Sequence, residues 1–180
     1  MQHTERRLRH LEVPEQGWSQ LACWPMDEID IDQIGDELVV AAVAATPAWV
    51  RRSVGNVVTA QQLEIPDNAS ALVDDAAERA VRYIERHLGA LVHTDIDQQA
   101  TTPLSIFRDA ARFPVEVLHP LGATPVHRGD VSRWAFPNDP FAITPENLAD
   151  VGPEVQTAGI TWGAAKAGLH LERRRNEGLR

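Results

Sequence analysis

The sequence predicts an all-α protein, and three observations support this prediction. The stretch from Ala69 to about Val92 places apolar residues at helical spacing along its whole length. Thr102-Pro103 and Thr144-Pro145 are typical helix starts, with threonine as N-cap and proline in the first turn. Strand signals are weak, and no internal repeat is visible. We therefore expect one helical bundle spanning residues 1–180, with an N-terminal arm and a long ordered loop before the last helix.

The N-terminal arm covers residues 1–26 and shows no clear periodicity. We expect an extended or partly helical segment whose Trp18 and Trp24 pack onto the body. A helix from about Asp32 to Thr46 follows, because apolar residues share one face and acids crowd its start. The valines at 39, 40 and 43 make a buried strand the competing interpretation. Pro47 then suits the first turn of a second helical piece, Pro47–Val54, with Gly55-Asn56 as its stop.

The helix from Ala69 to Val92 is the clearest element, and it is expected to be the longest or second longest. Asn68 or Ser70 can serve as its N-cap. Opposite charges four residues apart stabilise its polar side. Its apolar stripe should be among the most buried parts of the protein, and it comprises Val73, Ala77, Ala80, Ile84, Leu88 and Leu91.

Three further helices are expected after this one. The first opens at Thr102-Pro103, the second is a short helix opening at Thr144-Pro145, and the last runs from near Pro153 to about Arg175. In the last helix the small residues at 159, 163, 164, 167 and 168 are expected to permit close approach of a neighbouring helix.

The loop from 127 to 143 is the first candidate for a binding surface. Eight of the twelve prolines lie between Thr102 and Pro153, which favours an ordered connection. Arginine and aromatic residues, which are enriched at binding hot spots, gather within it as Arg128, Arg133, Trp134 and Phe136. The same aromatics can instead anchor the loop to the helices. We expect a buried Trp134, with the two arginines left accessible.

Lys166 and His170 are the second pair of candidate residues. Lys166 is the one lysine in a chain that otherwise uses arginine, and it lies among alanines and glycines with His170 one turn further on. A desolvated lysine can act as a nucleophile or pair with a ligand. A pocket between the helix from Ala69 to Val92 and the last helix would use Lys166 or His170 together with Asp109, Arg112 or Arg133.

No metal and no cofactor are expected. Asp30 begins a calcium-like loop, but Ile34 and Ala41 stand where oxygen ligands belong. His93, Asp95 and Asp97 form a group without a recognised zinc motif, placed where a helix should end and capping residues are common. Motifs for nucleophilic catalysis and for phosphate binding are also absent, and no catalytic residue is assigned.

Charge and hydropathy limit the remaining function classes. The net charge of −9 disfavours a nucleic-acid-binding protein, although Arg108 and Arg112 within a helix-turn-helix-like stretch, Pro103–Leu121, keep that alternative open. The longest apolar run, Leu38–Ala45, is too short to span a membrane, and no signal peptide is visible, so we expect a cytoplasmic protein.

These observations favour a non-enzymatic protein-binding or regulatory protein that contacts a protein partner or its own copy. The alternative is a small-ligand-binding protein or enzyme with a pocket near Lys166 and His170. The missing catalytic motifs and the Arg/Trp/Phe loop favour the first interpretation.

Overall fold

The computed structural model describes residues 30–125 and 139–178. The arm, and with it Trp18 and Trp24, lies outside these ranges, as do Arg128, Arg133, Trp134 and Phe136 of the loop. All regular structure within the described ranges is helical, so the all-α prediction is confirmed. The elements in chain order are α2 (Ile31–Gln61), α3 (Ala69–Val92), η2 (Ile96–Gln98), α4 (Pro103–Ala110), α5 (Arg112–Leu118), η3 (Leu148–Asp150) and α7 (Pro153–Asn176).

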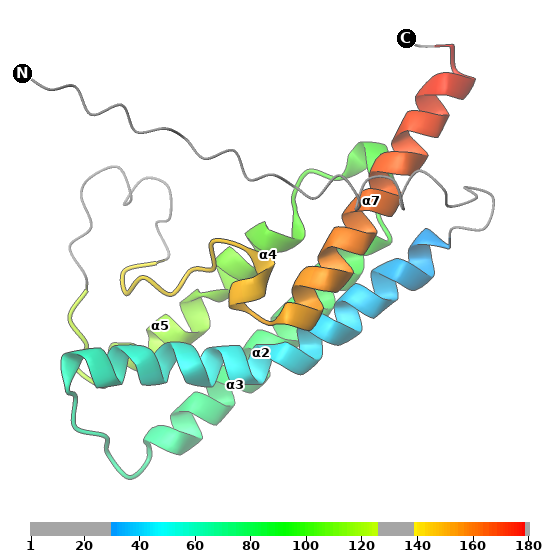
Figure 1. Ribbon diagram of the computed structural model, residues 1–180. Coiled ribbons are helices and arrows are strands. Elements are labelled where there is room, and N and C mark those ends of the chain that lie inside the picture. The colour runs from blue at the N-terminus through cyan, green and yellow to red at the C-terminus, as the bar shows by residue number, and fades with distance from the viewer. Residues whose placement is uncertain (1–29, 126–138, 179–180) are drawn as a thin grey trace, which may run out of the picture.

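The two long helices α2 and α3 form an antiparallel hairpin to which the remaining helices attach (Figure 1). The short helices α4 and α5 pack on α3, and α5 also contacts α2. Helix α7 crosses α2, contacts η3 near its own start, and extends its last turns beyond the rest of the described chain (Figure 1). One side of α7 therefore belongs to the bundle, and its C-terminal end projects from it.

Helix α2 corrects the prediction of two pieces separated at Pro47. It is one helix of 31 residues that continues through Pro47 and past Gly55-Asn56. Pro47 has no N–H to donate to the Val43 carbonyl, so the helix lacks one hydrogen bond at this turn. The buried hydroxyl of the preceding Thr46 donates to the Ala42 carbonyl at 2.7 Å and is thereby satisfied. Burial of side chains stabilises the helix beyond Pro47. The buried residues of its second half are Trp49, Val50, Ser53, Val54, Val57 and Val58. The competing strand interpretation is wrong, because the valines in question lie within this helix.

Helix α3 has the predicted boundaries, Ala69–Val92. Five residues of its predicted stripe are buried, and Val73 at the first turn is partly buried. Asn68 occupies the N-cap position without a side-chain hydrogen bond. The opening of α4 is confirmed as well, since the Thr102 hydroxyl accepts from the Ser105 N–H. In α3 and α4 the buried residues are the apolar residues at helical spacing, which explains why both helices could be predicted from the sequence.

The short helix expected at Thr144-Pro145 begins later than predicted. Its position is taken by η3, which starts at Leu148 and is capped by Asn147. Asn147 and Asp150 form a capping box. The Asn147 side-chain oxygen accepts a hydrogen bond from the Ala149 N–H, and the Asp150 carboxylate accepts one from the Asn147 N–H. The asparagine therefore displaces the threonine as the helix start. Helix α7 begins at Pro153 as expected and ends at Asn176.

The buried apolar residues form one continuous core between α2, α3, α4, α5 and the start of α7. Trp49 and Phe107 meet edge to face near its centre, with ring centroids 6.0 Å apart. Among the described residues, no helix is both long enough and apolar enough to cross a membrane.

Candidate functional site

The part of the predicted loop that the structure describes is anchored to the helices. Phe141 is buried and meets the ring of His119 edge to face at 5.5 Å. Asp139 is also buried and accepts a hydrogen bond from the Ile143 N–H. Anchoring by an aromatic side chain was expected of this loop and is found at Phe141. The expected burial of Trp134 lies outside the described residues and stays a prediction.

Lys166 and His170 lie on α7 but point to different neighbours. The Lys166 ammonium lies 4.9 Å from the centre of the Trp162 ring, within range of a cation–π contact. Trp162 itself is buried. His170 is half exposed, and its Nδ1 lies 3.2 Å from Asp97 Oδ1. Each side chain therefore has a partner within the fold, and a pocket shared by the two stays a prediction.

The residues of the predicted histidine–aspartate group, His93, Asp95 and Asp97, contact two different helices. His93 is the C-cap of α3, and its Nε2 lies 3.1 Å from Asp36 at the start of α2. Asp95 and Asp97 instead accept hydrogen bonds from Arg173 of α7, at 3.0 and 3.3 Å. Within the described ranges, no three metal-ligating side chains converge. The arrangement ties the ends of three helices together.

The contact between Asp95 and Arg173 favours the charged form of both groups. A hydrogen bond from the Asp97 N–H and the guanidinium of Arg173 hold the pKa of Asp95 below its usual value. The same carboxylates raise the pKa of Arg173. The interaction is exposed to solvent and joins the second half of α7 to η2.

A cavity of about 710 Å³ lies between α2 and the segment that leads to η3. Its polar side chains mainly hold that segment in place. Arg52 donates to the carbonyl oxygens of Asp150 and Val151 at the end of that segment. Gln61 makes two hydrogen bonds of 2.8 Å with the backbone of Thr124, which follows α5. Neither Lys166 nor His170 lines this cavity.

The side of α7 that faces away from the bundle carries a row of apolar residues. At about 100° a residue, the row lies opposite the buried Val155, Trp162 and Ala165. We call it the outer face of α7, and it consists of Ile160, Ala164, Ala167 and Leu171. The side chains of Ile160 and Leu171 are 62% and 65% exposed. Large apolar residues of a surface helix usually face the core instead.

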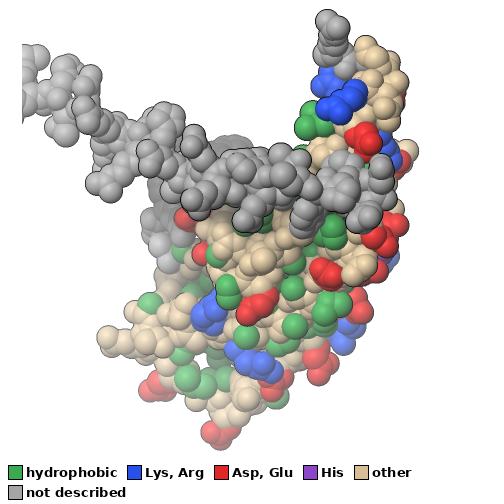
Figure 2. Space-filling model, turned by 45° about the vertical axis from the view of Figure 1, so that its right-hand side comes forward, with side chains coloured by type: hydrophobic (Ala, Val, Ile, Leu, Met, Phe, Trp, Pro, Cys, Tyr) green, Lys and Arg blue, Asp and Glu red, His purple; other side chains and the backbone are tan. Residues whose placement is uncertain are grey.

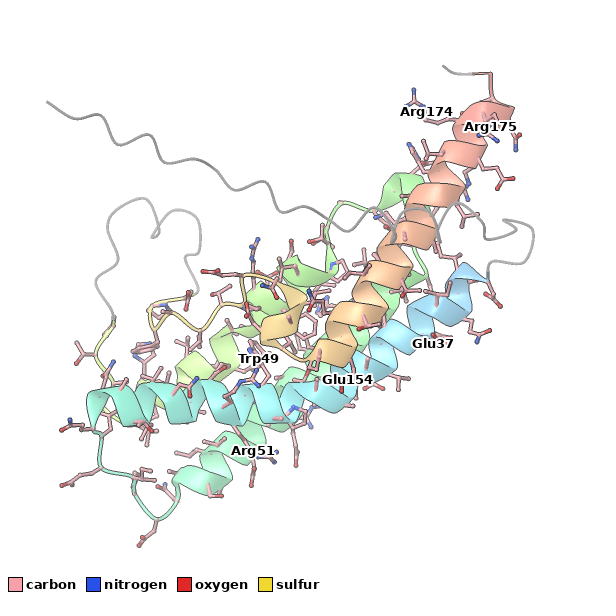
Figure 3. The ribbon with its side chains drawn as sticks, in the orientation of Figure 1. Glu37, Trp49, Arg51, Glu154, Arg174 and Arg175 are labelled. Atoms are coloured by element: carbon pink, nitrogen blue, oxygen red, sulfur yellow. The ribbon has the colours of Figure 1, made fainter. Side chains whose placement is uncertain are left out.

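Charges of opposite sign flank the two ends of this outer face. Glu154 lies at its beginning, close to Glu37 of α2, and the two acids line the same two surface cavities. Figure 3 shows both glutamates where α7 starts along α2, with Arg174 and Arg175 at the far end of α7. Within the described chain, Glu154, Arg174 and Arg175 form no ion pair, whereas Arg173 does.

The acidic end also carries exposed apolar surface from α2. Val40 is 68% exposed, and with Ala41, Ala44 and Ala45 it lines a cavity of about 650 Å³ beside Glu154. Figure 2 shows hydrophobic, acidic and basic side chains intermixed on this side of the molecule. The apolar row on the outer face of α7 thus has acidic side chains of α2 and α7 at one end and Arg174 and Arg175 at the other.

No family model, curated protein or solved structure matches the chain significantly.

The outer face of α7 was not predicted from the sequence. The small residues of this helix were expected to contact a neighbouring helix, and Gly159 does lie against Leu148 of η3. Gly163 has nothing within 4 Å of the position a Cβ would take, and Ala167 is exposed. The available signal was the spacing of four, three and four residues from Ile160 to Leu171, which is the spacing of a coiled-coil seam.

Proposed function

We propose that this chain is a non-enzymatic protein-binding module and that the outer face of α7 is its binding surface. The observation that carries the proposal is the exposure of Ile160 and Leu171 on a helix whose opposite side is already buried. Exposed apolar residues in a row, bordered by charged groups, are typical of protein interaction sites.

A helical partner fits this surface better than a small molecule does. The outer face is a convex helix surface, whereas ligand sites are concave and enclose most of the ligand. Helix partners bind through apolar residues spaced three and four apart, which is the spacing found here. The cavity of about 710 Å³ is a concave alternative, but the side chains of Arg52 and Gln61 that line it already bond to backbone groups of the fold.

A site-specific cross-linker tests the proposal in cells that express the full chain. A photoreactive amino acid replaces Ile160, and a matched variant carries it at the exposed Glu85 of α3. We expect a discrete protein adduct from position 160 that disappears when Leu171→Glu is added, because both residues belong to one surface. Adducts of equal kind and yield from positions 160 and 85 would contradict the proposal.

A further inference from the structure

The outer face of α7 is symmetric about its own midpoint. Ile160 and Leu171 lie at equal distances from the point between Ala165 and Lys166, and so do Ala164 and Ala167. The row therefore reads large, small, small, large in both directions. Such a row matches itself when two copies lie antiparallel, since each large residue then faces a large one and each alanine faces an alanine.

We propose that the outer face of α7 binds the same face of a second copy of this chain, with the two α7 helices antiparallel. The inference rests on the proposed function, because it names the partner of the same surface. Spacing of four, three and four residues packs side chains of one helix between those of another at a shallow crossing angle. The alanines at the centre, with the exposed Gly163 beside them, allow the two backbones to approach closely.

The charges at the two ends of α7 support the antiparallel orientation. Arg174 and Arg175 lie about 30 Å along the helix from Glu154, so they cannot pair with it in the same chain. When the helices run in opposite directions, the arginine end of each copy lies at the Glu154 end of the other. A parallel pair would instead place arginines against arginines and glutamates against glutamates, which is unfavourable.

The position of Arg175 around the helix makes the pairing more specific. At about 100° a residue, Arg175 and Glu154 lie on the same flank of the outer face, the flank toward α2. In an antiparallel pair, like flanks of the two helices meet. Arg175 of one copy therefore lies beside Glu154 of the other, and Glu37 of α2 adds negative charge at the same place. Two such contacts form, one at each end.

A single helix pair is a small interface. Specific interfaces of this kind fall at or below about 1,200 Å² of total buried surface and are typical of weak association. We expect a dissociation constant of the order of micromolar for the full chain. It should rise with salt, because one charged contact lies at each end of the apolar row.

Cysteine cross-linking tests the orientation directly, in the full chain with Cys23→Ser. The variants Ile160→Cys and Leu171→Cys are made separately, one with a mass tag, and oxidised alone and mixed. We expect disulfide-linked dimers only in the mixture. Two Ile160 positions in an antiparallel pair lie about 16 Å apart along the helix axis, and a disulfide requires Cα atoms within about 7 Å. Dimers from Ile160→Cys alone would overturn the antiparallel proposal.

Charge reversal tests the paired ends. Glu154→Arg and Arg175→Glu should each weaken dimerisation about threefold or more in sedimentation equilibrium, and the double variant should regain most of the lost affinity. Glu85→Arg on α3 is the matched control and should leave the dissociation constant unchanged. Failure of the double variant to regain affinity would overturn the proposed pairing.

A chain that stays monomeric at all concentrations would overturn self-association altogether. The proposed function would then depend on the cellular cross-linking result, in which an adduct with a different protein supports a binding face and names another partner. The failures of the two proposals are thereby distinguishable.

Discussion

Gly35 of α2 lies directly against Val92 of α3. A Cβ built on Gly35 would come within 2.8 Å of the Val92 Cβ, closer than real side chains approach. The contact joins the first turn of α2 to the last turn of α3, and the neighbouring His93 reaches Asp36 across the same junction. The close approach of these two helix ends thus depends on the missing side chain.

Gly35→Ala should lower the free energy of unfolding by about 1–3 kcal/mol, because the added methyl group forces two stiff helix ends apart. The measurement is urea-induced unfolding followed by circular dichroism. Gly55→Ala in the same helix is the control, since nothing lies within 4 Å of its Cβ position. That variant should be stabilised by up to about 1 kcal/mol through helix propensity. Equal effects of the two substitutions would contradict the close contact.

Leu88 and Leu72 make a second matched pair, on α3. Leu88 is fully buried, and Leu72 is 37% exposed. Leu88→Ala should cost about 2–5 kcal/mol of unfolding free energy, while Leu72→Ala should stay within about 1 kcal/mol. Chemical unfolding of both variants checks this ordering. A larger loss from Leu72→Ala would mean that α3 buries a different face.

Much of the fold could be predicted from sequence where one local pattern decides the outcome. Helix α3 combines a long apolar stripe with charged pairs, and α4 starts at a Thr-Pro cap, so both were located correctly. The boundary within α2 was misplaced because Pro47 and Gly55 weaken a helix locally, whereas burial of Trp49 and the following valines stabilises it over a longer distance.

The candidate surface was harder to predict than the fold. Small residues in a helix favour close packing, but the sequence does not say which side of α7 receives a neighbour. Gly159 meets Leu148, and Gly163, one turn later, meets nothing in the described chain. One side of α7 is buried because α2 and η3 pack against it. That packing is tertiary and does not follow from the local sequence of α7.

The contact between Asp95 and Arg173 predicts a pH dependence of stability. The folded-state pKa of Asp95 lies below its unfolded value, because the Asp97 N–H and Arg173 favour the carboxylate. This contribution is fully present above the unfolded pKa of about 4 and is lost as the pH falls through the folded-state pKa. Asp95→Asn should therefore be less stable than the natural chain at pH 7 and converge with it toward pH 2.

Thermal unfolding across pH 2–7 measures this difference. Glu64→Gln, in the exposed connection between α2 and α3, is the control for loss of one negative charge. A difference between Asp95→Asn and the natural chain that persists unchanged at pH 2 would show that the contact does not depend on the carboxylate charge.

The most direct test of self-association through the outer face of α7 is the midpoint of thermal unfolding as a function of chain concentration. The natural chain is compared with Ile160→Glu/Leu171→Glu, in which both exposed residues are made polar. Association stabilises the folded state by mass action. We predict equal midpoints at the lowest concentrations and a midpoint that rises with concentration for the natural chain alone. A double variant that unfolds earlier at every concentration by the same amount would contradict the account, because Ile160 and Leu171 would then support the fold of one chain and not its contact with a partner.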